Sequence, residues 1–408
     1  MMLNKATLGI AALGAVGLAT TDLAEEKPSS VLTALSSTTI SGYVDTSVIW
    51  KIGKGNGNKS ALDGIGYAEA PGEPSQAKVD GVNLNIVMLT VEKPLDEAGW
   101  AAGYKVDLLF GPDADDYGTT TQVGGDLAIK QAYVALRVPL GNNLDFKIGV
   151  YDHPLGYEAF ESYKNPNYSH SYGYFLEPAA YTGVHLDYGF TDWLSVFGGL
   201  GETPSGFINV RSGRHIDGVD YFYENKKTYY GGITLTAPKD LGLLEGSTLT
   251  AGAYNGLGSP NADDPDDASR GDTTGILVSG TMKTPVKGLE IGSAWDYRIQ
   301  RYHPSVQLNE YAIAAYIVYA GIDKWKLAVR GDYYNSSYND ALYHVTNSAD
   351  NELFALTTTV DYQLWQNVTT RLEFRWDHDL TGQQNGNGPF GDDDSNSFIT
   401  ALNVVYRF

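Results

Sequence analysis

The sequence predicts an all-β chain that closes into a transmembrane antiparallel barrel. Apolar and polar residues alternate with a period of two in runs of about 8–12 residues. Aromatic residues mark the ends of these runs, and short connections alternate with long ones. The composition excludes other classes. Cysteine is absent, so disulfides and cysteine nucleophiles are ruled out, and a formal net charge of −21 argues against a nucleic acid as partner.

The N-terminal residues, 1–24, are typical of a secretory signal peptide. A positively charged start precedes an uncharged run of 14 residues, which is shorter than the ~20 residues that a membrane helix needs. We expect cleavage after Ala19 or Ala24. The polar segment 25–39 follows, and the barrel is expected to occupy 40–408. An exported chain without a helical span can cross a membrane only as strands.

The alternation is clearest in six runs, which lie at 100–110, 144–151, 289–298, 325–334, 368–377 and 398–408. One face of each run is free of charge and is expected to contact lipid. The other face is expected to line a wet lumen with Lys105, Asp107, Lys147, Arg330, Asp332, Arg371, Glu373, Arg375 and Asp377. A soluble sandwich alternates in the same way. Runs of about 9–11 residues favour tilted membrane strands, because soluble strands average about 5–6.

The connections give the strand count. Aromatic pairs such as Tyr188 and Trp193 bracket the short turns, as expected for rings at a membrane surface. Long loops are predicted near 52–79, 111–126, 152–179, 202–227, 256–273, 298–308, 335–351 and 378–397. The runs between these connections number sixteen, with 14 or 18 strands as alternatives. The pattern is weakest in 193–201 and in 127–138, where Lys130 falls on the lipid-facing side.

The end of the chain supports a family resemblance. The run Leu402–Phe408, with Tyr406 and Phe408, resembles the signal that the barrel-assembly machinery recognises, and Tyr188–Leu194 resembles a tight periplasmic turn. With its signal peptide and alternation, the chain resembles Gram-negative outer-membrane porins, in particular the OmpL-like β-barrel porin family. The resemblance implies a place in the outer membrane among its lipids and lipopolysaccharide, and a homotrimer by analogy.

The longest predicted loop, 152–179, follows the fifth strand. The resemblance implies that this loop folds into the lumen and narrows it, while a loop lying over the rim is the alternative. Its residues of interest are Asp152, His153, Glu158, Glu161, Tyr168 and Tyr172. We expect the carboxylates to face Lys147, Arg330, Arg371 and Arg375 and to set a transverse field. The tyrosines either stack sugars or pack against the barrel wall.

Neither catalysis nor a cofactor is predicted. Asp152 and His153 are neighbours, but no serine completes a catalytic arrangement with them. Acidic runs in the extracellular loops have oxygen ligands of the kind that Ca²⁺ or Mg²⁺ prefers, above all Asp263, Asp264, Asp266 and Asp267. Their spacing does not match an EF-hand, and solvated charge is the usual role of such runs.

The sequence therefore predicts a water-filled outer-membrane channel for passive diffusion of small hydrophilic solutes and ions. The alternatives are a substrate-selective channel for carbohydrates or anions, a structural or adhesive barrel without an open pore, and a barrel enzyme. Because much of the acidic excess lies in the extracellular loops, we expect a weak preference for cations.

Overall fold

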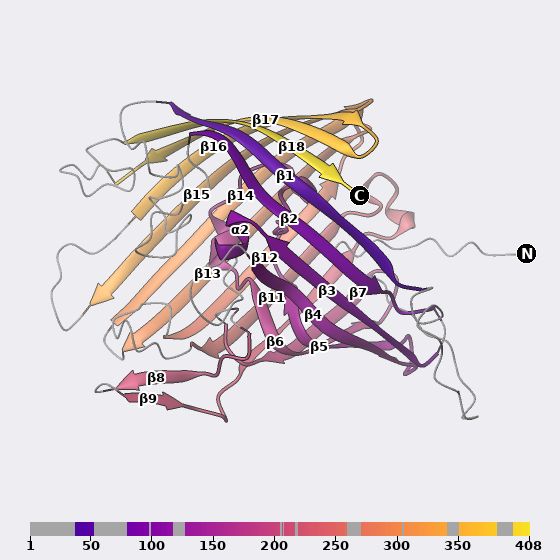
Figure 1. Cartoon of the computed structure of the whole chain (residues 1–408), viewed down its shortest axis with the longest axis vertical. Helices are drawn as coiled ribbons and strands as arrows, with labels where there is room; N and C mark the ends of the chain where they lie inside the picture. Colours follow the sequence, from indigo (N-terminus) through magenta and orange to yellow (C-terminus); the bar gives the residue numbers. More distant parts are fainter. Residues whose placement is uncertain are drawn as a thin grey trace, which may run out of the picture.

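Sixteen strands close into one antiparallel barrel, which confirms the predicted fold class and strand count (Figure 1). The computed structural model describes residues 37–52, 80–97, 99–116, 127–204, 206, 208–216, 219–258, 271–303, 306–340, 351–381 and 395–408. The predicted signal peptide lies outside these residues. None of the described helices is long and apolar enough to cross a membrane.

The barrel strands follow one another in chain order around the wall. They are β1 (Thr39–Ile52), β2 (Gly81–Lys93), β3 (Ala101–Phe110), β4 (Leu127–Val138), β5 (Leu144–Asp152), β6 (Ala180–Gly189), β7 (Leu194–Gly201), β10 (Thr228–Thr236), β11 (Thr248–Leu257), β12 (Asp272–Lys283), β13 (Leu289–His303), β14 (Val306–Ile322), β15 (Trp325–Asp340), β16 (Asn351–Trp365), β17 (Val368–Asp379) and β18 (Asn396–Arg407). The remaining elements are a hairpin of β8 (Gly213–Ile216) and β9 (Val219–Phe222), the helix α2 (Pro112–Asp116), and the 3-10 turns η2 (Ser162–Lys164), η3 (Gly173–Leu176) and η4 (Lys239–Leu244).

The two faces of the wall follow the predicted alternation. On β17, Leu372 is 53% exposed on the outside, whereas its neighbours Arg371 and Glu373 are only 1% and 3% exposed on the inside. Pairing carries this parity around the barrel, because Leu372 lies opposite Val360 on β16 and Leu402 on β18. In this part of the wall the structure places Leu372 outward and Arg371 and Glu373 inward, as the alternation predicts.

A β-bulge explains the misplaced charge on β4. Asp107 of β3 pairs with Gln131, but the next residue, Leu108, pairs with Ile129, so Lys130 is the extra residue. A bulge lets two successive side chains turn to the same face. Lys130 and Gln131 are both buried, and Lys130 forms ion pairs with groups inside the barrel. The lipid-facing position expected from parity is therefore wrong for this residue.

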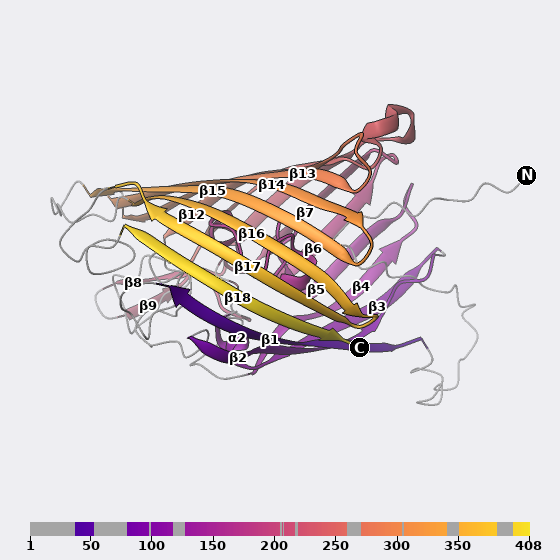
Figure 2. The ribbon, with the colours of Figure 1, turned by 90° about the horizontal axis from the view of Figure 1, so that it is seen from above.

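Several strands extend beyond the spans predicted from the sequence. Figure 2 shows β13, β14 and β15 side by side along the wall. The long loop predicted at 298–308 is wrong, because β13 continues to His303 and β14 begins at Val306. An ion pair between Arg298, at the start of the expected loop, and Glu310 on β14 joins the two strands at 2.7 Å. The predicted loop 335–351 likewise starts too early, since β15 runs to Asp340.

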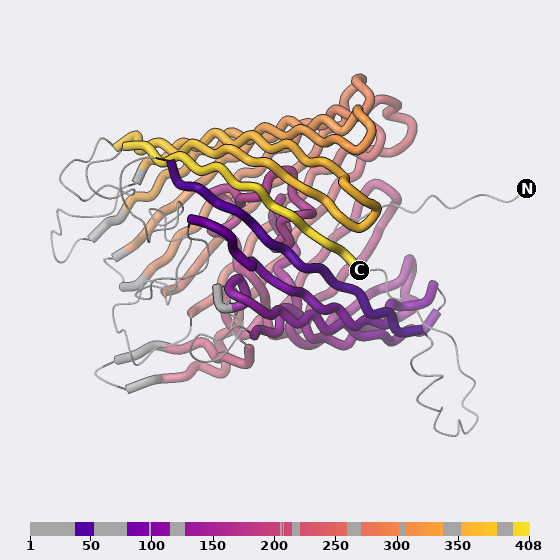
Figure 3. The backbone as a smooth tube through the Cα atoms, turned by 45° about the horizontal axis from the view of Figure 1, so that its top comes forward, coloured from indigo at the N-terminus to yellow at the C-terminus, as the bar shows by residue number. Residues whose placement is uncertain are grey.

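The C-terminus closes the barrel against β1 (Figure 3). Phe408 and Gly42 exchange two main-chain hydrogen bonds, each 3.0 Å long. The ring of Phe408 packs so closely on Gly42 that an added Cβ there would lie 2.8 Å from it. The last residue thus completes the seam between the first and last strands.

Deleting Phe408 should reduce assembly of the folded barrel. Its loss removes two main-chain hydrogen bonds at the seam, worth about 1–3 kcal/mol together. The heat-modifiable fraction of the protein in outer-membrane preparations would measure the effect. Trp365→Ala, which removes an aromatic ring that is 68% exposed at the end of β16, is the control. Equal assembly of both variants would contradict a role for Phe408.

Candidate functional site

The predicted loop 152–179, which starts at the last residue of β5 and ends just before β6, lies inside the barrel. It contains η2 and η3, and its side chains and main chain contact strands around the wall. The contacted residues include Asp45 on β1, Asn85 on β2, Tyr254 on β11, Ser279 on β12, Tyr316 on β14 and Thr359 on β16. A segment that touches strands this far apart around a closed wall can only lie in the lumen.

The loop holds part of its shape by itself. The Asn165 side chain donates a hydrogen bond to the carbonyl of Ala159 at 2.7 Å and accepts one from the amide of Ala159 at 2.8 Å. A side-chain amide that bonds in both directions replaces a pair of main-chain partners. The amide of Lys164 also donates to the carbonyl of Glu161 within η2, at 2.9 Å.

Arg330 on β15 binds the loop from one side. Its Nη1 donates to the Glu158 carboxylate at 3.0 Å and its Nη2 donates to the carbonyl of His170 at 2.9 Å. Its Nε donates to Asp332 on the same strand at 2.8 Å. The guanidinium is fully buried, and its fork geometry suits several acceptors at once.

Arg371 and Arg375 on β17 repeat this arrangement. Arg371 donates to the carbonyls of Ser162 and Asn165, both at 2.6 Å. Arg375 donates to the carbonyl of His170 at 2.6 Å and pairs with Asp377 at 2.8 Å. Both side chains are 1% exposed. These arginines hold the main chain of the loop against the wall instead of facing open water.

Carboxylates of the wall accept hydrogen bonds from the loop, whereas the arginines donate to it. The amides of Tyr168 and Ser169 donate to Glu373 at 2.6 and 3.0 Å. The amide of Tyr172 donates to Asp332 at 3.1 Å. Carbonyls and amides of the loop main chain thus both have charged hydrogen-bond partners on the wall. These side chains take the place that water would have around an exposed loop.

The three loop carboxylates find different partners. Glu158 meets Arg330, as expected, and accepts hydrogen bonds from the Tyr316 hydroxyl at 2.9 Å and the Ser171 amide at 2.8 Å. Asp152 and Glu161 pair instead with Lys130, which the bulge turns inward. The expected pairing with Lys147, Arg371 and Arg375 is therefore wrong for these two. None of the described carboxylates pairs with Lys147, whose ammonium lies 5.7 Å from the ring centre of Tyr133.

The charge of Glu161 follows from this environment. Burial raises the pKa of Glu161, but Lys130 and Lys164 lower it more, so that the pKa falls to about 2. Burial raises the pKa of Glu158 despite the opposing effect of Arg330. Glu161 is consequently a carboxylate at neutral pH. Its ion pair with Lys130 fixes the loop to the wall in addition to the arginine contacts.

Several wall residues that contact this loop were not singled out from the sequence, and Lys326, which pairs with the wall residue Asp361, is a charged example among them. Lys326 donates to the carbonyl of Asn165 at 3.0 Å and pairs with Asp361 at 2.7 Å. Lys326 and Asp361 both lie on the charged face of their strands, and this is the only sequence feature that could have indicated them. Lys105 and Asp107, by contrast, were expected in the lumen and form a pair there at 3.6 Å.

The loop tyrosines pack against the wall. Tyr172 is 1% exposed, its hydroxyl donates to Asp377 at 2.6 Å, and its ring lies 5.2 Å from the guanidinium carbon of Arg375. Tyr168 is also buried, and its hydroxyl accepts a hydrogen bond from Asn85 at 3.1 Å. Of the two expected roles, the structure favours packing, because both side chains are buried.

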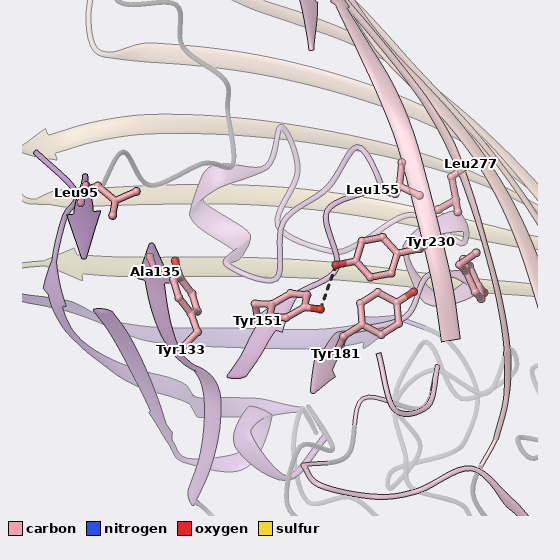
Figure 4. Packing of buried hydrophobic residues seen from close by; sticks show 10 residues of the cluster. Leu95, Tyr133, Ala135, Tyr151, Leu155, Tyr181, Tyr230 and Leu277 are labelled. Carbon is pink, nitrogen blue, oxygen red and sulfur yellow. Dashed lines mark hydrogen bonds between the residues drawn. The ribbon is translucent and has the colours of Figure 1, made fainter. Parts of the chain in front are cut away.

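His153 lies among tyrosines at the start of the loop. Its ring centre is 5.3 Å from that of Tyr181 and 5.7 Å from that of Tyr254. In the same cluster the Tyr230 hydroxyl donates to the Tyr151 hydroxyl at 3.1 Å (Figure 4). Burial lowers the pKa of His153 to about 3, with a smaller contribution from His185. The ring is neutral at physiological pH and does not form an ion pair with Asp152.

A metal centre finds no support in the described part of the chain, where no group of three or more His, Asp or Glu could hold an ion. The candidate ligands Asp263, Asp264, Asp266 and Asp267 lie outside the described residues.

A closed membrane barrel with a loop clamped in its lumen defines a class of protein, the outer-membrane channels. A family model described as β-barrel porin-2, OmpL-like, matches residues 37–408. The chain belongs to this family and is therefore a porin of the outer membrane, a channel for passive diffusion. No curated protein sequence matches the chain.

Solved structures of bacterial porins share the fold. The channel DcaP of Acinetobacter baumannii is 14% identical, with 91% of this chain and 97% of that chain covered and a TM-score of 0.59. An anion-selective porin from Comamonas acidovorans is 10% identical, with 91% and 99% covered and a TM-score of 0.55. The trimer form of OmpT from Vibrio cholerae is 13% identical, with 91% and 99% covered and a TM-score of 0.54.

Proposed function

We propose that the porin passes small hydrophilic solutes and ions, with the loop 152–179 as the constriction that limits their size. One observation carries this proposal: Arg330, Arg371 and Arg375 bind the main chain of the loop deep inside the barrel. A barrel of sixteen strands encloses an aqueous channel that is wide unless something fills part of it. A loop fixed by buried guanidiniums narrows it by a constant amount.

The proposal also covers the surroundings of the pore. Porins are not enzymes by kind, and we extend this to the present chain, which would need neither catalytic residues nor a cofactor. We propose that it is inserted by the barrel-assembly machinery and works as a homotrimer among outer-membrane lipids and lipopolysaccharide. The trimer form of the structurally similar OmpT supports the oligomer.

Swelling of liposomes tests the choice of solute. Vesicles that contain the purified porin are diluted into isotonic solutions of neutral sugars of increasing size. We expect the swelling rate to fall steadily with solute size and to rise linearly with concentration, because passive diffusion does not saturate. A swelling rate that saturates for one sugar, or that does not depend on solute size, would favour the substrate-selective channel instead.

The ion preference should be weakly cationic. The buried arginines of the constriction are all occupied by the loop or by neighbouring carboxylates, so they are poorly placed to attract anions. The net charge of −21 includes acidic runs in the extracellular loops, which concentrate cations at the mouth. The preference should fade as salt shortens the Debye length from about 10 Å at 0.1 M to about 3 Å at 1 M.

Reversal potentials under a KCl gradient measure this preference. Replacing Asp263, Asp264, Asp266 and Asp267 by asparagine should reduce it, whereas Asp240→Asn and Glu245→Gln in the turn between β10 and β11, at the other end of the barrel, should leave it unchanged. A preference for chloride at low salt would contradict the proposed role of the acidic mouth.

A further inference from the structure

The turn between β10 and β11 is unusual for its end of the barrel. β10 ends at Thr236 and β11 begins at Thr248, so the turn is much longer than the one between β14 and β15, which end and begin at Ile322 and Trp325. Its extra residues form η4. Short turns are the rule on the periplasmic side of such barrels, so the added length calls for a reason.

The turn has a hydrogen-bonded main chain but leaves leucine side chains exposed. Leu241, Leu243 and Leu244 are 53%, 66% and 42% exposed. The main chain around them is hydrogen-bonded, with Ala237 donating to Ser247 at 2.8 Å and Gly246 donating to Ala237 at 2.9 Å. Gly242, at φ +56°, allows the sharp bend between Leu241 and the other two leucines. The fold thus holds three apolar side chains outward instead of burying them.

The position of the turn indicates what covers the leucines. Figure 2 shows the coiled ribbon of η4 projecting beyond the barrel wall, away from the barrel axis. The strands that carry it present Ile233 and Leu249 on the outer face, 45% and 48% exposed. At the same end, Trp325 and Tyr362 form part of the aromatic belt, with ring centres 4.6 Å apart. The leucines therefore continue the lipid-facing surface at the level of the membrane boundary.

We propose that this leucine tip, Leu241, Leu243 and Leu244, inserts into the inner leaflet of the outer membrane and anchors the periplasmic rim of the barrel. An apolar group that projects sideways from a membrane wall meets acyl chains before it meets a periplasmic protein. Lys239, Asp240 and Glu245 flank the leucines and are exposed, so the charged ends of the turn can remain among headgroups. This arrangement is that of a short interfacial anchor.

Single cysteines can test the proposal, because the native chain has none. Leu243→Cys and, separately, Leu241→Cys are labelled with the fluorophore NBD and reconstituted in phosphatidylcholine vesicles. The matched control is Asp323→Cys, an exposed residue in the two-residue turn at the same end. Heat modifiability confirms that each variant is folded. The quenchers are a phosphatidylcholine with a shallow spin label and iodide on both sides of the bilayer.

We expect the spin-labelled lipid to quench most of the fluorescence at 243 and 241 while iodide has little effect, and we expect the reverse at 323. Quenching by iodide at 243 and 241 to the extent seen at 323 would overturn the proposal, because the tip would then lie in water. Protection from both quenchers would also overturn it, since a second copy of the chain would then cover the leucines. The result is independent of whether the pore conducts.

Discussion

Replacing Arg375 by alanine should both loosen the constriction loop and destabilise the barrel. The substitution removes the donor to the carbonyl of His170 and leaves Asp377 buried without its cation. Breaking a buried ion pair by removing one partner costs about 3–5 kcal/mol. Since the freed segment of the loop can then move, we expect a larger and noisier single-channel conductance, together with a lower denaturant midpoint.

Two further variants test whether the lost contacts of Arg375 cause the changes in conductance and stability. Arg301→Ala removes an exposed arginine from β13 whose Nε donates to the side chain of Gln307 at 3.2 Å. This variant should behave like the wild type. Arg375→Lys keeps the charge but cannot bind several acceptors in one plane, so it should fall between the two. If Arg375→Ala and Arg301→Ala gave the same conductance and stability, the proposed role of Arg375 in fixing the constriction loop would be rejected.

Leu372→Arg should destabilise the barrel from the outside. Leu372 is 53% exposed on the lipid face near the middle of β17, with Leu402 and Val360 beside it on the neighbouring strands. A charge on the lipid face costs about 2–4 kcal/mol at the bilayer midplane and about 0–1 kcal/mol near the surface. Equilibrium unfolding in lipid vesicles would measure the loss.

The matched control is Leu380→Arg, which lies just beyond the end of β17 and is 45% exposed. The same change in chemistry at the rim should cost little. Equal destabilisation at both positions would mean that depth in the membrane does not decide the effect, and the assigned faces of β17 would then be in doubt.

The sequence predicted the wall better than its ends. A period of two is a local property, so the outward Leu372 and the inward Arg371 could be assigned without knowing their partners. The ends of β13 and β14 could not, because their pairing continues through Arg298 and Glu310 beyond the span that a bilayer requires. Lys130 conflicted with the parity of its strand, but only the register with β3 shows that a bulge resolves the conflict.

The interior of the site was harder to predict than its location. Family resemblance placed the loop 152–179 in the lumen, yet its contacts join residues far apart in the chain, such as Glu158 and Arg330. Many of its partners are main-chain carbonyls, for instance those of Ser162 and Asn165. Every residue has such a carbonyl, so no sequence pattern can identify them in advance.

Single-channel recording in a planar bilayer tests most directly whether the barrel is an open pore narrowed by its own loop. We expect the purified wild-type porin to give a steady conductance step that varies linearly with voltage, and Arg375→Ala to give a larger step in the same membrane. A folded, heat-modifiable protein that inserts but gives no conductance in either form would contradict the open pore.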